Sequence, residues 1–181
     1  ASGHLWMQRL IILLVAFVRP VMAAWPQNTP VSGYRIVNVY PHDPAAFTQG
    51  LFVKDGCFYE STGQYGESTL RKVDIKSGEV LQKTAMSDIV FGEGITHWNG
   101  KIIGLTWRSG IGFSWDAKSF KRLGQFKYQG EGWGLTHDDS HLIMSDGTST
   151  LRFLNPDTMA LERRLEVMVN GRKIPYVNEL E

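Results

Sequence analysis

The sequence lacks the features on which several large classes of protein depend. Cys57 is the only cysteine among 181 residues, so the chain can form neither an intramolecular disulfide nor a zinc site built from cysteines. An excess of charge of one sign is also missing, because 19 basic residues face 18 acidic ones and the net charge is +1. A nucleic-acid-binding domain usually carries a clustered basic excess, so we expect no nucleic-acid partner.

A helical pattern is missing as well. From Tyr34 onward no apolar repeat of helical period extends over a dozen residues. The chain instead contains short runs typical of strands, separated by Asp-Gly, Asn-Gly and Ser-Gly turn signals. Its 19 glycines and 12% aromatic residues suit many short strands with tight turns, and 43% hydrophobic residues suffice for a core. The composition therefore predicts one all-β domain.

Long apolar runs are absent except near the N-terminus. There Leu10–Val18 follows Arg9 and precedes a small-residue site that ends at Ala23, which is the pattern of a secretory signal. The run is too short to span a bilayer, which needs about 20 residues. We expect a signal peptide over 1–23, a linker over 24–33, and an exported protein, periplasmic or secreted, with no stable membrane insertion after cleavage. A short membrane anchor is the alternative.

The chain after the linker contains an internal repeat. A glycine followed by an aliphatic residue recurs at Gly50, Gly94 and Gly134, which are 44 and 40 residues apart. Each copy is followed by a turn, a strand, a loop and two further strand signals at matching distances. Four strands in roughly 40–45 residues are typical of one blade of a β-propeller. The repeat therefore predicts a β-propeller.

The sequence contains about three and a half such units. A strand predicted over Tyr34–Tyr40 would supply the outer strand of a final blade, and Val177–Leu180 resembles the start of a fourth copy. Propellers close with about 4–8 blades. We therefore expect residues 34–181 to form an incomplete propeller domain, truncated from a longer protein.

The repeat also predicts where a site would lie. The first strand of each blade lines the axis of a propeller, so equivalent positions of successive blades converge there. Gln49, Glu93, Trp133 and Asn178 occupy one such position, and their different chemistry favours a ligand site over packing. Strand geometry places Trp107 at the same rim, where the other units have glycine.

These residues predict an aromatic-walled cavity that holds one carboxylate, Glu93. Removal of a carboxylate from water raises its pKa, and a pKa near neutrality suits proton transfer. Two structural alternatives remain open. Glu93 would pair with backbone amides in one of them, and Trp107 and Trp133 would only pack in the core in the other.

Other combinations of reactive residues lack a functional pattern. His137–His141 has the residue types of a metal site but coincides with a hairpin turn of the other units, and we interpret it as a plain turn. No His-Glu-x-x-His occurs, and the Gly-x-Gly pairs do not open a helix after a strand. Ser61, Ser114 and Ser145 have no persuasive His or Asp partner. We therefore expect no metal and no cofactor.

Seven motifs, in the same order, resemble the plant-type glutaminyl-peptide cyclotransferases, a family that also has bacterial members. They begin at Phe47, Tyr59, Phe91, Leu105, Glu131, Ser145 and Val177. The resemblance implies a five-bladed propeller and a metal-independent enzyme of the aminoacyltransferase class. Its reaction would convert the N-terminal glutamine of a peptide or protein to pyroglutamate and release ammonia.

The resemblance also implies a role for each site residue. Glu93 would be the general acid/base that takes a proton from the α-amine and gives one to the leaving ammonia. Asn178 would hydrogen-bond the substrate. The residues that form the cavity wall and orient the amide would be Phe47, Gln49, Phe91, Trp107 and Trp133. Because amine and carboxamide belong to one molecule, the enzyme mainly has to fold the substrate, move protons and stabilise an oxyanion.

The family continues past Val177–Glu181 with a further tryptophan and a lysine of the same cavity, so an inactive truncation is one expectation for this chain. A non-catalytic propeller that binds a peptide or small ligand at its axis is the alternative function, since fold alone does not separate the two. A lyase would need a metal or a histidine base at the axis, and the sequence places neither there. We expect a monomer.

Overall fold

The structure is a computed structural model that describes residues 32–181. The predicted signal peptide, residues 1–23, and residues 24–31 of the predicted linker lie outside the described residues. Within 32–181 every regular element is a strand, so this part of the chain offers no helix that could cross a membrane. The all-β prediction is confirmed.

Twelve strands form three four-stranded antiparallel sheets, each from consecutive strands. The first sheet contains β1 (Thr48–Lys54), β2 (Cys57–Thr62), β3 (Thr69–Asp74) and β4 (Val80–Ala85). The second contains β5 (Gly92–Trp98), β6 (Lys101–Thr106), β7 (Ile111–Asp116) and β8 (Arg122–Lys127). The third contains β9 (Leu135–His137), β10 (Leu142–Met144), β11 (Thr150–Leu154) and β12 (Leu161–Glu166). A short hairpin of β13 (Met168–Val169) and β14 (Arg172–Lys173) follows.

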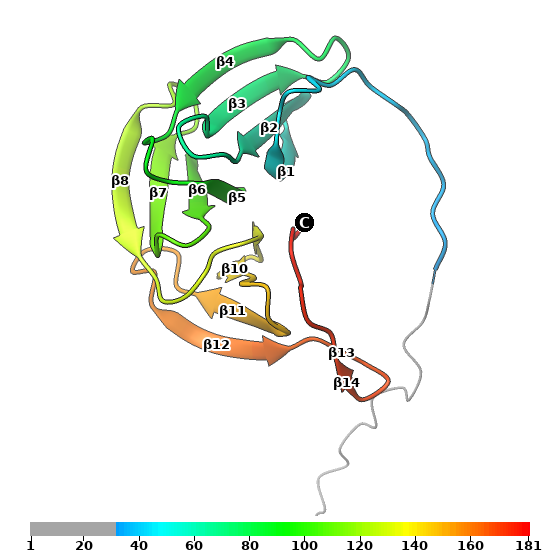
Figure 1. Cartoon of the computed structure of the whole chain (residues 1–181), viewed down its shortest axis with the longest axis vertical. Helices are drawn as coiled ribbons and strands as arrows, with labels where there is room; N and C mark the ends of the chain where they lie inside the picture. The colour runs from blue at the N-terminus through cyan, green and yellow to red at the C-terminus, as the bar shows by residue number, and fades with distance from the viewer. Residues whose placement is uncertain (1–31) are drawn as a thin grey trace, which may run out of the picture.

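The three sheets stand around a common axis as propeller blades (Figure 1). β1 contacts β5 and β5 contacts β9 on the inside, whereas β4, β8 and β12 form the outer rim. The chain after β14 runs back to the centre of this arc (Figure 1). The propeller predicted from the repeat is confirmed, and the count of five blades stays a prediction.

Short turn sequences explain why the inner hairpins form. Asp55-Gly56 joins β1 to β2, and Asn99-Gly100 joins β5 to β6. All four residues have positive φ, between 46° and 76°. Two-residue turns with positive φ at both positions have the twist that antiparallel strands need, and Asn-Gly and Asp-Gly adopt them most readily.

In the third blade a side chain makes the corresponding turn. The Asp138 carboxylate accepts hydrogen bonds from the backbone N–H groups of Ser140 and His141 at 2.8 and 2.6 Å. This is the local bonding that favours Asp in turns, so the interpretation of His137–His141 as a turn is confirmed.

The hydrophobic core lies between the blades because successive residues of a strand face opposite sides of a sheet. In β6, Ile102 packs into the cluster between the first and second blades, and Ile103 and Leu105 pack into the cluster between the second and third. All three side chains are buried. The second blade is therefore covered on both faces, and the first and third blades are each covered on the face toward it, which holds the inner strands close to the axis.

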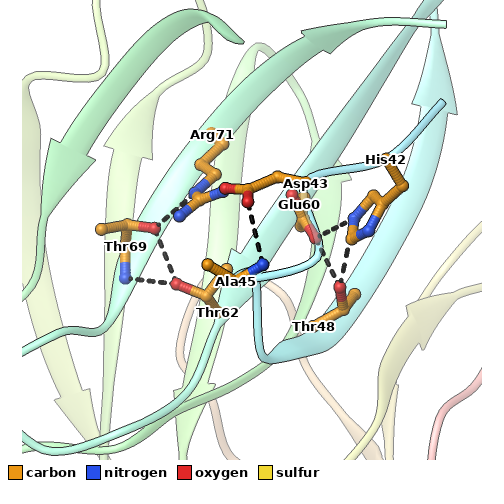
Figure 2. Close-up of polar contacts among 8 residues, drawn as sticks. All are labelled: His42, Asp43, Ala45, Thr48, Glu60, Thr62, Thr69 and Arg71. Carbon is orange, nitrogen blue, oxygen red and sulfur yellow. Dashed lines mark hydrogen bonds and ion pairs between the residues drawn. The ribbon is translucent and has the colours of Figure 1, made fainter. Parts of the chain in front are cut away.

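Polar side chains attach the segment before β1 to the first blade (Figure 2). Arg71 on β3 donates to Asp43 at 2.8 Å, and the buried carboxylate of Glu60 lies 2.8 Å from the His42 ring. The Thr48 hydroxyl donates to the same Glu60 oxygen at 2.5 Å (Figure 2). These contacts set the start of β1, which carries part of the predicted site.

One expected strand is not formed. Tyr34–Tyr40 pairs with no strand among residues 32–181, and its side chains are largely exposed. Figure 1 shows the segment leading away from the first blade. Its β-branched and aromatic residues are typical of strands, but a strand forms only where a partner supplies hydrogen bonds, and the described residues place none beside it.

Candidate active site

The structure brings the seven predicted site residues together around one cavity of about 370 Å³ on the inner side of the blades. The lining consists of Phe47, Gln49, Gln64, Phe91, Glu93, Trp107, Trp133 and Asn178. Gln64 is the one lining residue that the sequence did not predict. The roles of the seven in catalysis and binding stay predictions.

Irregular strand pairing turns the axial residues toward this cavity. The register of β1 against β2 shifts by one residue between Thr48 and Gly50, which places Gln49 in a β-bulge. The register of β5 against β6 shifts in the same way between Gly92 and Ile95, around Glu93. A bulge leaves the extra residue outside the regular pairing and redirects its side chain, which is why bulges occur next to active sites.

The third blade repeats this irregularity just before β9. The Trp133 backbone N–H donates to the carbonyl of Ser145 at 3.1 Å, and the Ser145 N–H donates to Gly134 at 3.0 Å. Two consecutive residues therefore face one residue of the neighbouring chain, as in a bulge. The repeat in sequence corresponds to a repeat in backbone geometry at Gln49, Glu93 and Trp133.

Glu93 is the ionisable group of the cavity and is only 5% exposed. Burial, together with the negative charges of Glu179 and Glu131, raises the pKa of Glu93 from 4.5 to about 8. No donor within residues 32–181 hydrogen-bonds its carboxylate, so the alternative in which backbone amides hold it finds no support in these contacts. A carboxyl group with this pKa both takes up and gives up protons near neutral pH.

Phe91 is at the centre of the aromatic wall. Its ring meets the Phe47 ring edge-on at 6.0 Å, the Trp107 ring at 5.6 Å and the Tyr65 ring at 5.7 Å between centroids. Edge-to-face pairs at these distances are favourable. They hold one continuous apolar surface on this side of Glu93.

Glycine at two positions makes room for the aromatic rings. A Cβ atom at Gly63 would overlap the Phe91 ring, and one at Gly147 would overlap the Trp133 ring. These are the positions that correspond to Trp107 in the repeat. At this position the second blade therefore carries an indole, whereas the first and third blades carry glycine and leave space for the rings of Phe91 and Trp133.

Glu131 is a further residue of the site that sequence reasoning did not single out. One oxygen of its carboxylate accepts the indole N–H of Trp107 at 2.7 Å and that of Trp133 at 2.9 Å. The indoles thus have specific polar partners in addition to their packing. The available sequence signal was a carboxylate two residues before Trp133 in the third copy of the repeat.

Gln64 also lines the cavity, although no sequence pattern indicated this. It follows Gly63 after β2 and has a φ of 83°, a left-handed conformation that is uncommon for a residue with a side chain. Its carbonyl accepts a hydrogen bond from the Ser68 hydroxyl at 2.7 Å. The loop conformation, which cannot be read from the repeat, brings it to the cavity.

The C-terminal segment supplies Asn178 from the inner position of a fourth unit. The Ser145 hydroxyl donates to the Asn178 carbonyl at 2.6 Å, and the Leu51 N–H donates to the Glu179 carboxylate at 3.2 Å. Burial raises the pKa of Glu179 to about 7. The segment lies at the axis, as predicted, although it is not paired as a strand within residues 32–181.

The cavity therefore combines a proton-carrying carboxyl, three side-chain amides and an aromatic wall. In the described part of the chain, no three His, Cys, Asp or Glu side chains gather in an arrangement that would hold a metal ion. The arrangement suits a small polar group that is enclosed by rings, oriented by Gln49 and Asn178, and protonated or deprotonated by Glu93.

Comparisons with known proteins point to one family. Residues 9–181 match the family described as glutamine cyclotransferase. A glutaminyl-peptide cyclotransferase of Arabidopsis thaliana is 40% identical over 153 residues, which cover 83% of this chain and 48% of that protein. The chain thus spans about half the length of this curated relative.

Solved structures agree with this result. The crystal structure of Myxococcus xanthus glutaminyl cyclase superposes with a TM-score of 0.74 at 34% identity, over 80% of this chain and 61% of that one. The Neurospora crassa Pan2 WD40 domain superposes with a TM-score of 0.54 at 10% identity, over 66% of this chain and 36% of that one. The second similarity concerns the fold alone.

Proposed function

Since this chain belongs to the glutamine cyclotransferase family, we propose that it converts an N-terminal glutamine of a peptide or protein to pyroglutamate. The observation that carries the proposal is the buried carboxyl of Glu93, with its pKa of about 8, inside an aromatic cavity that also presents the amides of Gln49 and Asn178. A cavity of about 370 Å³ has room for one glutamine residue with its side chain folded back.

The reaction joins two groups of the same residue. The α-amine nitrogen attacks the side-chain carboxamide carbon, and the ionised Glu93 takes a proton from the attacking nitrogen. The protonated Glu93 then gives this proton to the amide nitrogen, the carbon–nitrogen bond breaks, and ammonia leaves as the five-membered lactam forms. One carboxyl serves both steps because its pKa lies near the working pH.

The other cavity residues act on the shape of the substrate. Ring formation needs the amine held close to the carboxamide, and a preorganised geometry supplies much of the rate in intramolecular reactions. Phe47, Phe91 and the two indoles limit the space, so that the glutamine side chain is compact. The Gln49 and Asn178 amides are the donors that would orient the carboxamide and stabilise the negative charge on its oxygen.

Three further properties belong to the same proposal. The signal pattern around Leu10–Val18 supports an exported protein, secreted or periplasmic. The proposed reaction requires an N-terminal glutamine, because the attacking group is a free α-amine and an internal glutamine has none. The hydrophobic core between the blades forms within one chain, which is compatible with a monomer.

The test measures ammonia release from a glutamine-initiated dipeptide, with and without a zinc chelator. It uses this chain, a version lengthened to match its relatives, and Glu93→Gln in each. We expect chelator-resistant release that Glu93→Gln lowers by at least about 100-fold, since general acid–base catalysis contributes about 10²–10⁴. Release at the normal rate from Glu93→Gln would refute the mechanism. No release from either length of the unsubstituted protein would refute the function and favour a ligand-binding propeller.

A further inference from the structure

We propose that Glu131 is a positioning residue that fixes both indole rings of the cavity through a single carboxylate oxygen. This role rests on the function proposed above, since it concerns the walls of the same cavity. The Oε2 atom of Glu131 accepts the Nε1–H of Trp107 at 2.7 Å and the Nε1–H of Trp133 at 2.9 Å. An indole has one donor and no acceptor, so each ring uses its only hydrogen bond here.

The two rings come from different blades, so no single strand fixes their relative orientation. A shared hydrogen-bond partner does so. Trp107 follows β6 in the second blade, and Trp133 precedes β9 in the third. Packing restricts the plane of a ring, but a short bond to an ionised acceptor also restricts its rotation in that plane. Bonding to one atom therefore fixes the angle between the two cavity walls.

Glu131 is itself held in place. Its second oxygen, Oε1, accepts the Nε–H of Arg108 at 3.1 Å, and the Arg108 guanidinium lies 3.8 Å from the centroid of the Trp107 ring. Arg152 donates to the Glu131 backbone carbonyl at 2.9 Å. The carboxylate, the guanidinium and the indole thus form a compact unit in which each group has a defined partner.

The charge of Glu131 gives it a second effect on the site. Hydrogen bonds from Trp133, Trp107 and Arg108 lower the pKa of Glu131, so it stays ionised where Glu93 titrates. Its negative charge is one of two that raise the pKa of Glu93, and Glu179 supplies the other. The Tyr128 phenol, whose own pKa is raised mainly by burial, also interacts electrostatically with Glu93. A positioning carboxylate next to the catalytic carboxyl therefore connects ring geometry with proton affinity.

The first part of the test reads the rings directly. Indole N–H resonances are recorded by ¹H–¹⁵N NMR on the full chain, and Trp107→Phe and Trp133→Phe assign the two signals. We expect both signals to shift in Glu131→Gln, which keeps an acceptor oxygen but loses the charge, and to shift further in Glu131→Ala. The control is Glu79→Gln, because Glu79 is an exposed glutamate away from the cavity. Unchanged signals in Glu131→Ala would overturn the proposal.

The second part separates positioning from a general loss of structure. In a cyclase-active form of the protein, we expect kcat/KM to fall about 10-fold in Glu131→Gln and about 100-fold in Glu131→Ala, the size of effect that misplaced groups produce. The acidic limb of the kcat profile should move to lower pH in Glu131→Gln, because one of the charges that raise the pKa of Glu93 is gone. A normal kcat/KM in Glu131→Ala, together with shifted indole signals, would also overturn the positioning role of Glu131.

The two proposals fail in different ways. If the unsubstituted protein at either length releases no ammonia but both indole signals depend on Glu131, the enzyme function is refuted and the placement of the rings by Glu131 is supported. If ammonia is released normally and the indole signals do not respond to Glu131→Ala, the enzyme stands and the positioning role is refuted.

Discussion

Burial makes the Glu93 carboxyl unfavourable for the folded chain as well as useful for catalysis. Only 5% of the residue is exposed, and this burial, with a smaller contribution from two further carboxylates, raises its pKa to about 8. Ionising Glu93 in the folded chain therefore lowers the free energy of unfolding of the whole domain, because its pKa differs between the folded and unfolded states. Sites built in this way commonly trade stability for activity.

We expect Glu93→Gln to raise the free energy of unfolding at pH 8.5 and to leave it nearly unchanged at pH 4. Between 4.5 and about 8 the folded chain binds a proton at Glu93 that the unfolded chain has lost, so stability from this group falls as the pH rises through that range. The shift from 4.5 to about 8 is about 3.5 pKa units, so at 1.36 kcal/mol for each unit the amide variant should gain about 5 kcal/mol above pH 8.

Urea unfolding at pH 4, 6 and 8.5 measures this effect. The exposed Glu79→Gln should show a difference from the wild type that does not change with pH. If the gain in Glu93→Gln were also independent of pH, Glu93 would be ionised in the fold at its ordinary pKa, and its proposed role would lose its main support.

On the scale of single elements, turns and bulges do most to shape the site. Gln49 and Glu93 each lie where a strand gains one residue over its partner. Gly63, directly after β2, leaves the space into which the Phe91 ring packs. Bulges and glycines at the strand ends therefore explain how regular sheets direct different functional side chains toward the axis.

We expect Gly63→Ala to destabilise the domain by about 1–3 kcal/mol, the usual cost of overpacking a core, and to raise KM by displacing Phe91. The added methyl group would overlap the Phe91 ring, and Gly63 does not have a positive φ, so the effect is steric. Chemical denaturation and steady-state kinetics measure the two effects.

Gly124→Ala on β8 is the matched control for this variant. A Cβ atom there would meet its nearest neighbour, the Ser114 hydroxyl, at 3.5 Å, an ordinary contact distance. We expect little change in either measurement. Equal losses in Gly63→Ala and Gly124→Ala would show that the packing of Phe91 over Gly63 has no special importance.

At the scale of the whole molecule, a buried serine on or directly after the second strand of a blade hydrogen-bonds the next segment at the axis. The Ser61 hydroxyl donates to the backbone carbonyl of Glu93 at 2.5 Å, and the Ser145 hydroxyl donates to that of Asn178 at 2.6 Å. Glu93 and Asn178 occupy the same position in the repeat. The serines that lack the partners of a nucleophile therefore hold the axial residues in place.

We expect Ser145→Ala to destabilise the domain by about 1–3 kcal/mol, because the Gly134 N–H and the Asn178 carbonyl both lose their bond to the hydroxyl. Amide hydrogen exchange should speed up in the segment after β14 more than in the blades. Ser114→Ala, which removes a half-buried hydroxyl without such bonds, is the control. Uniform exchange throughout the chain would contradict this role.

The sequence by itself determined the strands, the blades and the group of residues at the axis. Strand periodicity and Asp-Gly or Asn-Gly turns are local signals, and a repeat transfers its geometry from one copy to the next. For that reason Gln49, Glu93, Trp133 and Asn178 could be placed together before any coordinates were known. Phe47 and Phe91 came from the family resemblance, because their positions alone do not indicate a cavity.

Only the tertiary structure decided which side chains from different blades meet. Glu131 joins Trp107 to Trp133, and the loop at Gln64 turns into the cavity, through contacts that no local pattern specifies. Tyr34–Tyr40 has the composition of a strand but pairs with no described residue, because pairing depends on a partner and not on propensity. Contacts between blades depend on how all the blades pack together, so no local sequence pattern specifies them.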